Sequence, residues 1–122
     1  MIRIVVGGQI DKESIAARIR ELGGDKVQVT VRSDIDAAMD IKAHKADYYL
    51  GACLTGGGGA LAMAIALLGL QQCATLSMPG KIRSDEEIRQ EIRAGKKAFG
   101  FTGQHAAQVL PVVLQELLKE AL

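Results

Sequence analysis

This chain of 122 residues contains few aromatic residues and has almost no excess of charge of either sign. Only 3% of the residues are aromatic and tryptophan is absent, so the chain lacks the platforms on which proteins stack single-stranded bases. Its 15 basic and 14 acidic residues leave a net charge of +1, too small to attract a phosphate backbone strongly. We therefore expect no nucleic-acid partner.

Cysteine and long apolar runs are scarce as well. Cys53 and Cys73 are too few for a disulfide scaffold and lack paired C-x-x-C spacing, which predicts a reducing compartment and no metal site. The first residues, MIRIVVGGQ, do not have the pattern of a signal peptide. An apolar run begins at Ala60 and ends at Leu70, well short of the ~20 residues of a membrane span. We expect a cytoplasmic protein without membrane insertion.

The chain does contain a regular alternation of short apolar runs and segments with helical periodicity, which predicts one α/β domain over residues 1–122. The predicted strands are residues 2–6, 27–31, 48–52, 73–77 and 98–101. Ser33 and Ser84, each followed three residues later by an acidic residue, are expected to cap two of the helices. Ile35 and Met39 are expected to give the first of these helices its inner face.

The order of the strands follows from right-handed connections. They favour a three-layer αβα sandwich, whose five-stranded parallel sheet has the Rossmann- or flavodoxin-like order 2-1-3-4-5. In this order strands 1 and 3 flank the point where the chain changes direction along the sheet, and ligands bind there. Gly7 and Gly8 follow the first strand, and residues 56–59 are glycines that follow the third. The glycines therefore predict a ligand site at this edge.

The stretch CLTGGGGALAMAIALLG, residues 53–69, suggests what the site binds. Glycines before a helix leave backbone N–H groups open to a ligand, and the helix dipole favours an anion. Thr55 would add a hydroxyl donor, and Lys81 would add a counter-charge. The predicted anion-binding residues are Gly7, Gly8, Gln9, Thr55, Gly56, Gly57, Gly58, Gly59 and Lys81. The alternative is that the glycines only permit a tight turn and close packing.

Neither G-x-x-x-x-G-K-[ST] nor an early G-x-G-x-x-G is present, so we expect no ATP, NAD or other cofactor. The helix after the glycines, residues 60–70, is apolar on every side. Such a helix is buried either in the core or under a partner subunit. We expect a homo-oligomer, with this helix as the candidate contact.

Two side chains near the predicted site are candidates for catalysis. Cys53 ends the third strand, where a helix N-terminus would favour its thiolate as nucleophile or base; an inert buried cysteine is the alternative. His105 follows the fifth strand at the same edge and could serve as acid, base or donor, or else as a surface or capping group. Gln9 and Asp11 can reach the same edge, although Asp11 serves equally as a helix N-cap.

The segment DYYLGACLTGGGGALAMAIALLG closely resembles a bacterial family of unknown function, the YhfU-like proteins. The resemblance extends over the whole chain, including the early glycine, the AFGF strand and the segment HAAQVLP. Members of that family are encoded near predicted transporters and metabolic enzymes. The resemblance therefore implies a role in small-molecule metabolism.

A more distant resemblance, limited to one loop, is to type B ribose phosphate isomerases. Their third strand ends in C-G-T-G-x-G, in which the cysteine moves the proton and the following amides stabilise the enediolate. Here residues 53–58 read CLTGGG, with the cysteine, the threonine and both later glycines at matching positions. Where those enzymes carry Asp-His-Ala-Gly after the first strand, residues 8–11 read GQID, so the ring-opening group has no counterpart.

The sequence thus predicts a protein that binds a small anionic metabolite, a sugar phosphate or a carboxylate, at the glycines after strands 1 and 3. One alternative is a sugar-phosphate isomerase-like enzyme with Cys53 as base and the glycine amides as oxyanion hole. Another is a soluble partner of a transport system.

Overall fold

The computed structural model describes residues 1–54 and 57–120. The strands of its main sheet are β1 (Ile2–Gly8), β2 (Val27–Val31), β3 (Tyr48–Cys53), β4 (Cys73–Thr75) and β7 (Ala98–Thr102). The helices are α1 (Lys12–Gly23), α2 (Asp34–Lys42), α3 (Gly57–Ala60), α4 (Ala62–Leu68), α5 (Asp85–Arg93) and α6 (Ala106–Glu120). Short 3-10 turns are η1 (Gly24–Lys26), η2 (Leu70–Gln72) and η3 (Gly103–His105), and a small hairpin joins β5 (Ser77–Met78) to β6 (Lys81–Ile82).

The main sheet has five strands, all paired in parallel, in the order β2-β1-β3-β7-β4. The fold is therefore α/β with a parallel sheet, as predicted, but the predicted order of the last two strands is wrong. Strand β7 enters the sheet between β3 and β4 and leaves β4 at the edge. Every residue of β7 is buried, as an interior strand requires, whereas β4 is only 3 residues long and suits an edge.

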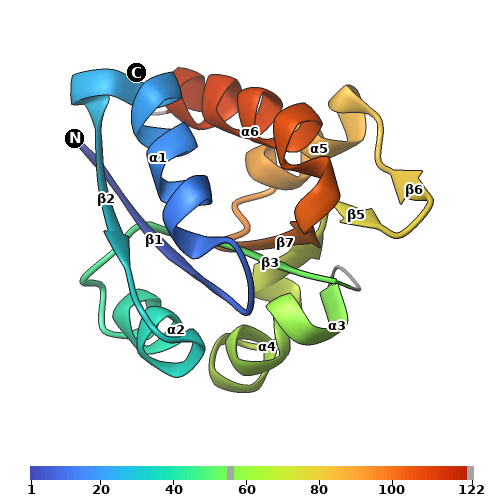
Figure 1. Ribbon diagram of the computed structural model, residues 1–122. Coiled ribbons are helices and arrows are strands. Elements are labelled where there is room, and N and C mark those ends of the chain that lie inside the picture. Colours follow the sequence, from blue (N-terminus) through green and yellow to red (C-terminus); the bar gives the residue numbers. More distant parts are fainter. Residues whose placement is uncertain (55–56, 121–122) are drawn as a thin grey trace.

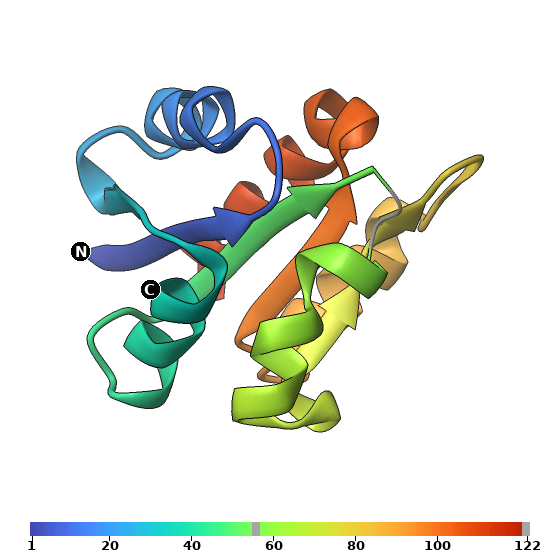
Figure 2. The same cartoon turned by 60° about the horizontal axis from the view of Figure 1, so that its bottom comes forward.

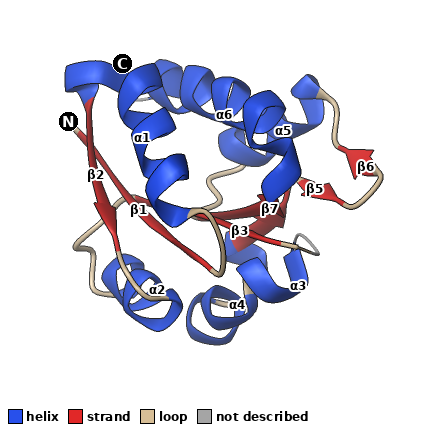
Figure 3. Cartoon of the chain, viewed as in Figure 1, coloured by secondary structure: helices blue, strands red, loops and turns tan. Residues whose placement is uncertain are grey.

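Helices flank both faces of this sheet (Figure 1; Figure 3). On one face α6 packs between α1 and α5, and on the other α2 packs against α4 while α3 contacts β3 and β7. The placement of α5 follows from the corrected order. Because the chain runs back toward the centre from β4 to β7, a right-handed connection brings α5 to the same face as α1.

The two faces of the sheet bury different kinds of side chain. Large aliphatic and aromatic residues fill the first, which we call the large-residue face; among them are Ile4, Val6, Ile15, Ile19, Leu50, Phe99, Phe101, Leu110 and Leu114. Small residues and one tyrosine dominate the second, which we call the alanine face; its buried cluster is Val5, Ala37, Ala38, Ile41, Ala46, Tyr49, Leu61, Ala64, Cys73 and Ala98. Alternate residues of β1, β3 and β7 supply the two sets, as the pleat requires.

The predicted helix caps are confirmed, but the inner face of α2 is not. The Ser33 hydroxyl accepts the Asp36 N–H at 3.2 Å, and Ser84 forms a reciprocal capping box with Glu87. Ile35 and Met39 are 53% and 44% exposed, so the prediction that they face inward is wrong. Alanines and Ile41 form the buried side of α2 instead, which lets this helix approach the sheet closely.

The apolar segment of residues 60–70 is not one continuous helix. Leu61, with φ −116° and ψ 2°, separates α3 from α4. Ala60, Leu61 and Ala64 are buried, whereas Ala62 and Ala66 are exposed on the outer side. The segment is therefore buried on one side only. No helix within residues 1–54 and 57–120 is both long enough and apolar enough to cross a membrane, and a cytoplasmic location stays a prediction.

Candidate functional site

The carboxyl ends of β1, β3 and β7 meet at one edge of the sheet (Figure 2). After β1 and β7 the chain continues into α1 and α6 over the large-residue face, whereas after β3 it continues into α3 over the alanine face. Neighbouring strands whose connections leave to opposite faces open a crevice at their carboxyl ends. Because β7 lies beside β3, such a crevice is expected both between β1 and β3 and between β3 and β7. The predicted strand order allowed only the first of these.

A hydrogen-bond network centred on Tyr49 joins four elements at this edge. The Tyr49 hydroxyl lies 2.6 Å from both the Asp34 Oδ1 and the Ala60 carbonyl oxygen. Asp34 Oδ1 also accepts the Gly8 N–H at 2.7 Å. Burial, followed by the hydrogen bond to Asp34, raises the pKa of Tyr49 far above its usual value, so the phenol keeps its proton.

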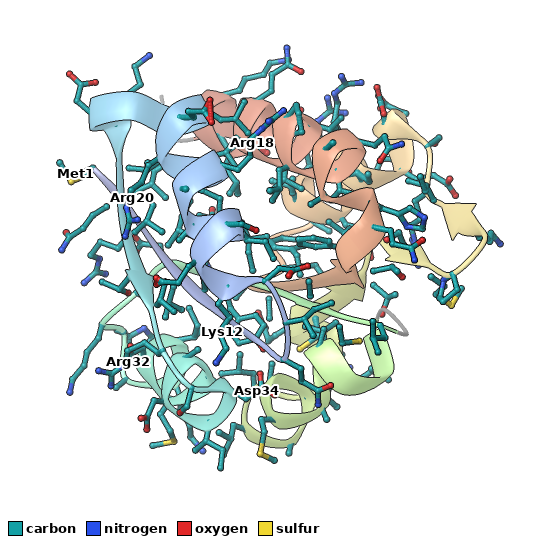
Figure 4. The ribbon with its side chains drawn as sticks, in the orientation of Figure 1. Met1, Lys12, Arg18, Arg20, Arg32 and Asp34 are labelled. Atoms are coloured by element: carbon teal, nitrogen blue, oxygen red, sulfur yellow. The ribbon has the colours of Figure 1, made fainter. Side chains whose placement is uncertain are left out.

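Sequence reasoning missed this network because its members come from β1, α2, β3 and α3, with no local spacing to connect them. In Figure 4 the labelled Asp34, from α2, and Lys12, from α1, both lie near the end of β1. The Lys12 ammonium donates to the Arg32 carbonyl at 3.1 Å. Asp34 Oδ1 therefore accepts from Gly8 and Tyr49, while the nearby Lys12 ammonium donates to a backbone carbonyl.

Packing accounts for the glycine pair after β1. A β-carbon on Gly7 would stand 2.5 Å from Tyr49 Cε2. Gly8 has φ +82°, and its β-carbon would stand 2.6 Å from the Ala52 nitrogen. The Gly8 N–H is bound by Asp34, and the Gln9 N–H donates to the Ala52 carbonyl at 2.9 Å. These two N–H groups are therefore used within the protein.

The glycine-rich stretch after β3 is described in part. Thr55 and Gly56 lie outside the described residues, and Gly57, Gly58 and Gly59 form most of α3. A β-carbon on Gly59 would stand 2.7 Å from the Gln9 Oε1 and 3.3 Å from the Cys53 Cβ. The structure thus brings together Gln9, Cys53 and Gly59, which the sequence predicted as one site.

Cys53 and Thr102 occupy paired positions on β3 and β7. Paired residues of neighbouring parallel strands point to the same side of a sheet, and here it is the alanine face, under α3. Both are almost fully buried, with exposures of 1% and 2%. Sequence reasoning missed Thr102; its only signal is that it precedes the Gly-Gln-His segment at the end of the fifth predicted strand.

The end of β7 carries two buried polar atoms that lack partners. Within the described residues, the Thr102 Oγ1 and the His105 Nδ1 are buried and have no hydrogen-bond partner. The Thr102 N–H, by contrast, donates to the Ser77 Oγ at 2.9 Å. Buried polar side chains without partners are uncommon in native proteins, because each costs desolvation that nothing offsets.

The loop after β1 packs against the same place. A β-carbon on Gly103 would stand 2.8 Å from the Ile10 Cδ1 and 3.2 Å from the Asp11 Oδ2. Asp11 is at the N-cap position of α1 but makes no capping hydrogen bond with its side chain, and its φ is 53°. Its carboxylate therefore lies beside the end of β7 and does not cap α1, and His105 follows two residues after Gly103.

Lys81 lies apart from these residues. It is exposed on β6, in the hairpin beyond β4. Hydrogen bonds with Ser84 lower the pKa of Glu87, and the charge of Lys81 adds a smaller contribution in the same direction. Cys73, the other cysteine, is buried in the alanine face, and burial raises its pKa. No three His, Cys, Asp or Glu side chains of the described ranges are grouped so that they would hold a metal ion.

Comparison with known proteins identifies the family. The family model described as "Protein of unknown function DUF2620" matches residues 2–117, and the chain belongs to this family. "Uncharacterized protein YhfU" of Escherichia coli strain K12 is 37% identical over 117 residues, which are 96% of this chain and 99% of the relative. The same figures hold for the protein of that name in Shigella flexneri. The resemblance to YhfU-like proteins is thus confirmed, and no solved structure matches the chain.

Proposed function

We propose that the protein binds a small anionic metabolite, a sugar phosphate above all, at the carboxyl ends of β3 and β7. The observation that carries this proposal is the pair of buried, unpartnered polar atoms, Thr102 Oγ1 and His105 Nδ1. They belong to the edge where the connections of β3 and β7 diverge, which is the usual ligand position in parallel sheets. A ligand that hydrogen-bonds to both would remove their desolvation cost.

In this proposal the anionic group of the ligand lies next to α3. The first N–H groups of any helical turn have no partner within the helix, and glycines let a ligand approach them closely. Gly57 to Gly59 supply such a turn directly above Cys53. The hydroxyl of Thr102 adds a donor from the strand below. The N–H groups of Gly8 and Gln9 are bound within the chain, so the proposed donor set does not include them.

The acceptors at the site favour a ligand that also carries hydroxyl groups. The Asp11 carboxylate and the Gln9 Oε1 both approach this edge from the loop after β1, as their distances to Gly103 and Gly59 indicate. A second negative group on the ligand would be repelled by Asp11, whereas sugar hydroxyls would donate to both oxygens. A sugar phosphate therefore fits better than a simple dicarboxylate.

An isomerase-like activity is the second candidate, favoured by the position of Cys53 under Gly59 and beside Thr102. In that reaction the Cys53 thiolate takes the proton from the carbon next to the carbonyl. The glycine N–H groups stabilise the enediolate, in which the proton of the neighbouring hydroxyl moves to the former carbonyl oxygen, and the thiol returns its proton to the former carbonyl carbon. A binding protein would leave that carbon-bound proton in place, so solvent deuterium enters bound sugar phosphate only if this activity exists.

Ribose 5-phosphate, inorganic phosphate, ribose and lactate, titrated separately, test the proposed site. At ~100 times its dissociation constant a ligand adds about 2.7 kcal/mol of stability, so ribose 5-phosphate should raise the unfolding temperature by several degrees. Gly59→Ala adds a methyl group against Gln9 and Cys53 and should weaken binding, whereas Ala17→Val on the exposed side of α1 should not. If no compound of this panel shifts the unfolding temperature of the wild-type protein, the proposal is contradicted.

We also propose that the protein forms a homo-oligomer through the outer sides of α2 and α4. Ile35 and Met39 are 53% and 44% exposed on α2, and this helix packs against α4, where Ala62 and Ala66 are exposed. Large apolar side chains gathered on neighbouring helices are typical of subunit contacts. Sedimentation should show an oligomer for the wild type and a monomer for Met39→Lys; a wild-type monomer would contradict this proposal.

A further inference from the structure

A cavity lies at the opposite end of the sheet, where β1, β3, β4 and β7 begin. It has a volume of about 390 Å³. The end of α2, the start of β3, the end of α4 and the residues before β4 and β7 surround it. Cavities of this size hold small organic molecules. It shares no residue with the proposed metabolite site.

One part of the lining of this cavity is apolar. It consists of Ile41 and Ala46 from the end of α2 and the following loop, together with Leu67 and Leu68 from the end of α4. Ile41 and Ala46 are 6% and 8% exposed, while the two leucines are half-buried. An inorganic ion would gain nothing from these side chains, whereas an aliphatic group would remove their remaining surface from water.

The rim of the cavity carries more positive than negative charge. Arg3, Lys42 and Lys97 line it against one carboxylate, Asp47. Asp47 is already paired with Arg3: its Oδ1 accepts from the Arg3 Nη2 at 3.0 Å, and its Oδ2 accepts the Arg3 N–H at 2.8 Å. This pair is neutral as a unit, so the surplus charge belongs to Lys42 and Lys97.

The two lysines differ in how they are held. The Lys97 ammonium lies 5.2 Å from the centre of the Tyr48 ring, which packs against the large-residue cluster and is not part of the cavity lining. Lys42 is exposed in the last turn of α2, where the helix carbonyls offset part of its charge. Lys97 and Lys42 therefore both supply positive charge to this side of the cavity, and the helix end reduces the contribution of Lys42.

From this combination we infer a second binding site, which takes a small organic anion: one carboxylate or phosphate group on a short aliphatic body. The charged group lies between Lys97 and Lys42, and the aliphatic body covers Ile41, Ala46 and the two leucines. Exposed charge pairs contribute little by themselves, so the affinity depends on the apolar contact as much as on the lysines. This inference does not rest on the metabolite site at the other edge.

Titration of the full chain with hexanoate, followed by the amide signals in ¹H–¹⁵N spectra, tests the inference. Saturable shifts should gather at Ala46, Asp47, Leu68 and Lys97. Hexyl phosphate should behave alike, whereas hexanol and inorganic phosphate should each bind at least about tenfold more weakly, since each lacks one half of the interaction. Inorganic phosphate binding as tightly as hexyl phosphate would overturn the proposal.

Charge reversals provide the second arm. Lys97→Glu should weaken hexanoate binding by about tenfold or more, because it replaces attraction by repulsion. Lys42→Glu should weaken it less. Lys81→Glu makes the same charge change on exposed β6 and should have no effect. Shifts scattered away from the cavity, or equal hexanoate affinity in wild type and both rim variants, would overturn the proposal. Ribose 5-phosphate should leave the cavity amides unshifted, which keeps this test separate from that of the metabolite site.

Discussion

The two faces of the sheet are built in different ways. On the large-residue face, Phe99 and Phe101 of β7 alternate with residues of the other face and pack with the aliphatic side chains of α1, α5 and α6. On the alanine face, small residues bring α2, α3 and α4 close to the sheet, and Tyr49 makes hydrogen bonds to Asp34 and Ala60. On this face the space between the helices and the sheet is closed by the near approach of their backbones and not by bulky side chains.

This difference separates the residues that contribute most to stability from those of the proposed binding site. Large buried side chains contribute most of the hydrophobic free energy, so the large-residue face carries more of the fold. Cys53, Thr102 and the glycines of α3 lie on the alanine face, where short side chains leave polar backbone and side-chain atoms near each other at the carboxyl edge. The following predictions test that division.

Phe99→Ala should have the largest effect on stability. The side chain is 0% exposed within the large-residue cluster, so its removal leaves a cavity that the neighbouring helices cannot fill. We expect the free energy of unfolding to fall by about 3–5 kcal/mol. Urea unfolding followed by circular dichroism measures it. A loss below about 1 kcal/mol would contradict the assignment of stability to this face.

Gly8→Ala should have the next largest effect on stability. The residue has φ +82°, and the added carbon would stand 2.6 Å from the Ala52 nitrogen and 2.7 Å from its carbonyl oxygen. Strain and this backbone clash together should cost more than about 2 kcal/mol. Gly24→Ala is the matched control: its φ is +57° but no atom lies within 4 Å, so only the conformational cost of about 1 kcal/mol applies. Equal losses in the two variants would contradict the close approach of β1 and β3.

Tyr49→Phe should cost about 1–3 kcal/mol, because the buried Ala60 carbonyl and the Asp34 Oδ1 lose the single hydroxyl proton that they share. The effect should also depend on pH. The folded pKa of Tyr49 lies above the unfolded value of about 10, so its contribution is complete below pH ~10 and is lost as the pH rises further. Unfolding at a series of alkaline pH values measures this. A wild type whose stability relative to Tyr49→Phe does not fall at high pH would refute the protonated phenol.

Much of the fold follows from local patterns. Val5 and Ile4 alternate between two buried faces, and Ser84 with Glu87 marks the start of α5 through a capping box. Such signals depend on residues near each other in sequence, and the structure confirms them. The order of β4 and β7 is different in kind. It depends on which strand fits beside β3, and this fit involves residues distant in sequence: a β-carbon on Gly100 of β7 would stand 2.6 Å from the Leu61 Cγ.

Part of the candidate site can likewise be predicted from the sequence, and part depends on contacts between distant residues. Gln9, Cys53 and Gly59 follow strand ends, and their meeting follows from the parallel sheet alone. Thr102 could be paired with Cys53 only once β7 was known to lie beside β3. Gly7 was interpreted as a ligand position, yet the tyrosine ring it accommodates comes from another strand. No spacing in the sequence reveals such a contact.

The most direct test of the account is Thr102→Val, with Thr30→Val on exposed residue 30 of β2 as the control. The Thr102 hydroxyl has no partner within the described chain, so its removal should leave the free energy of unfolding unchanged or raise it by about 1–2 kcal/mol. Binding of ribose 5-phosphate, measured by calorimetry, should weaken by about tenfold or more, while Thr30→Val leaves it unchanged. Unchanged affinity in Thr102→Val, or a loss of stability above about 1 kcal/mol, would contradict a ligand site at this edge.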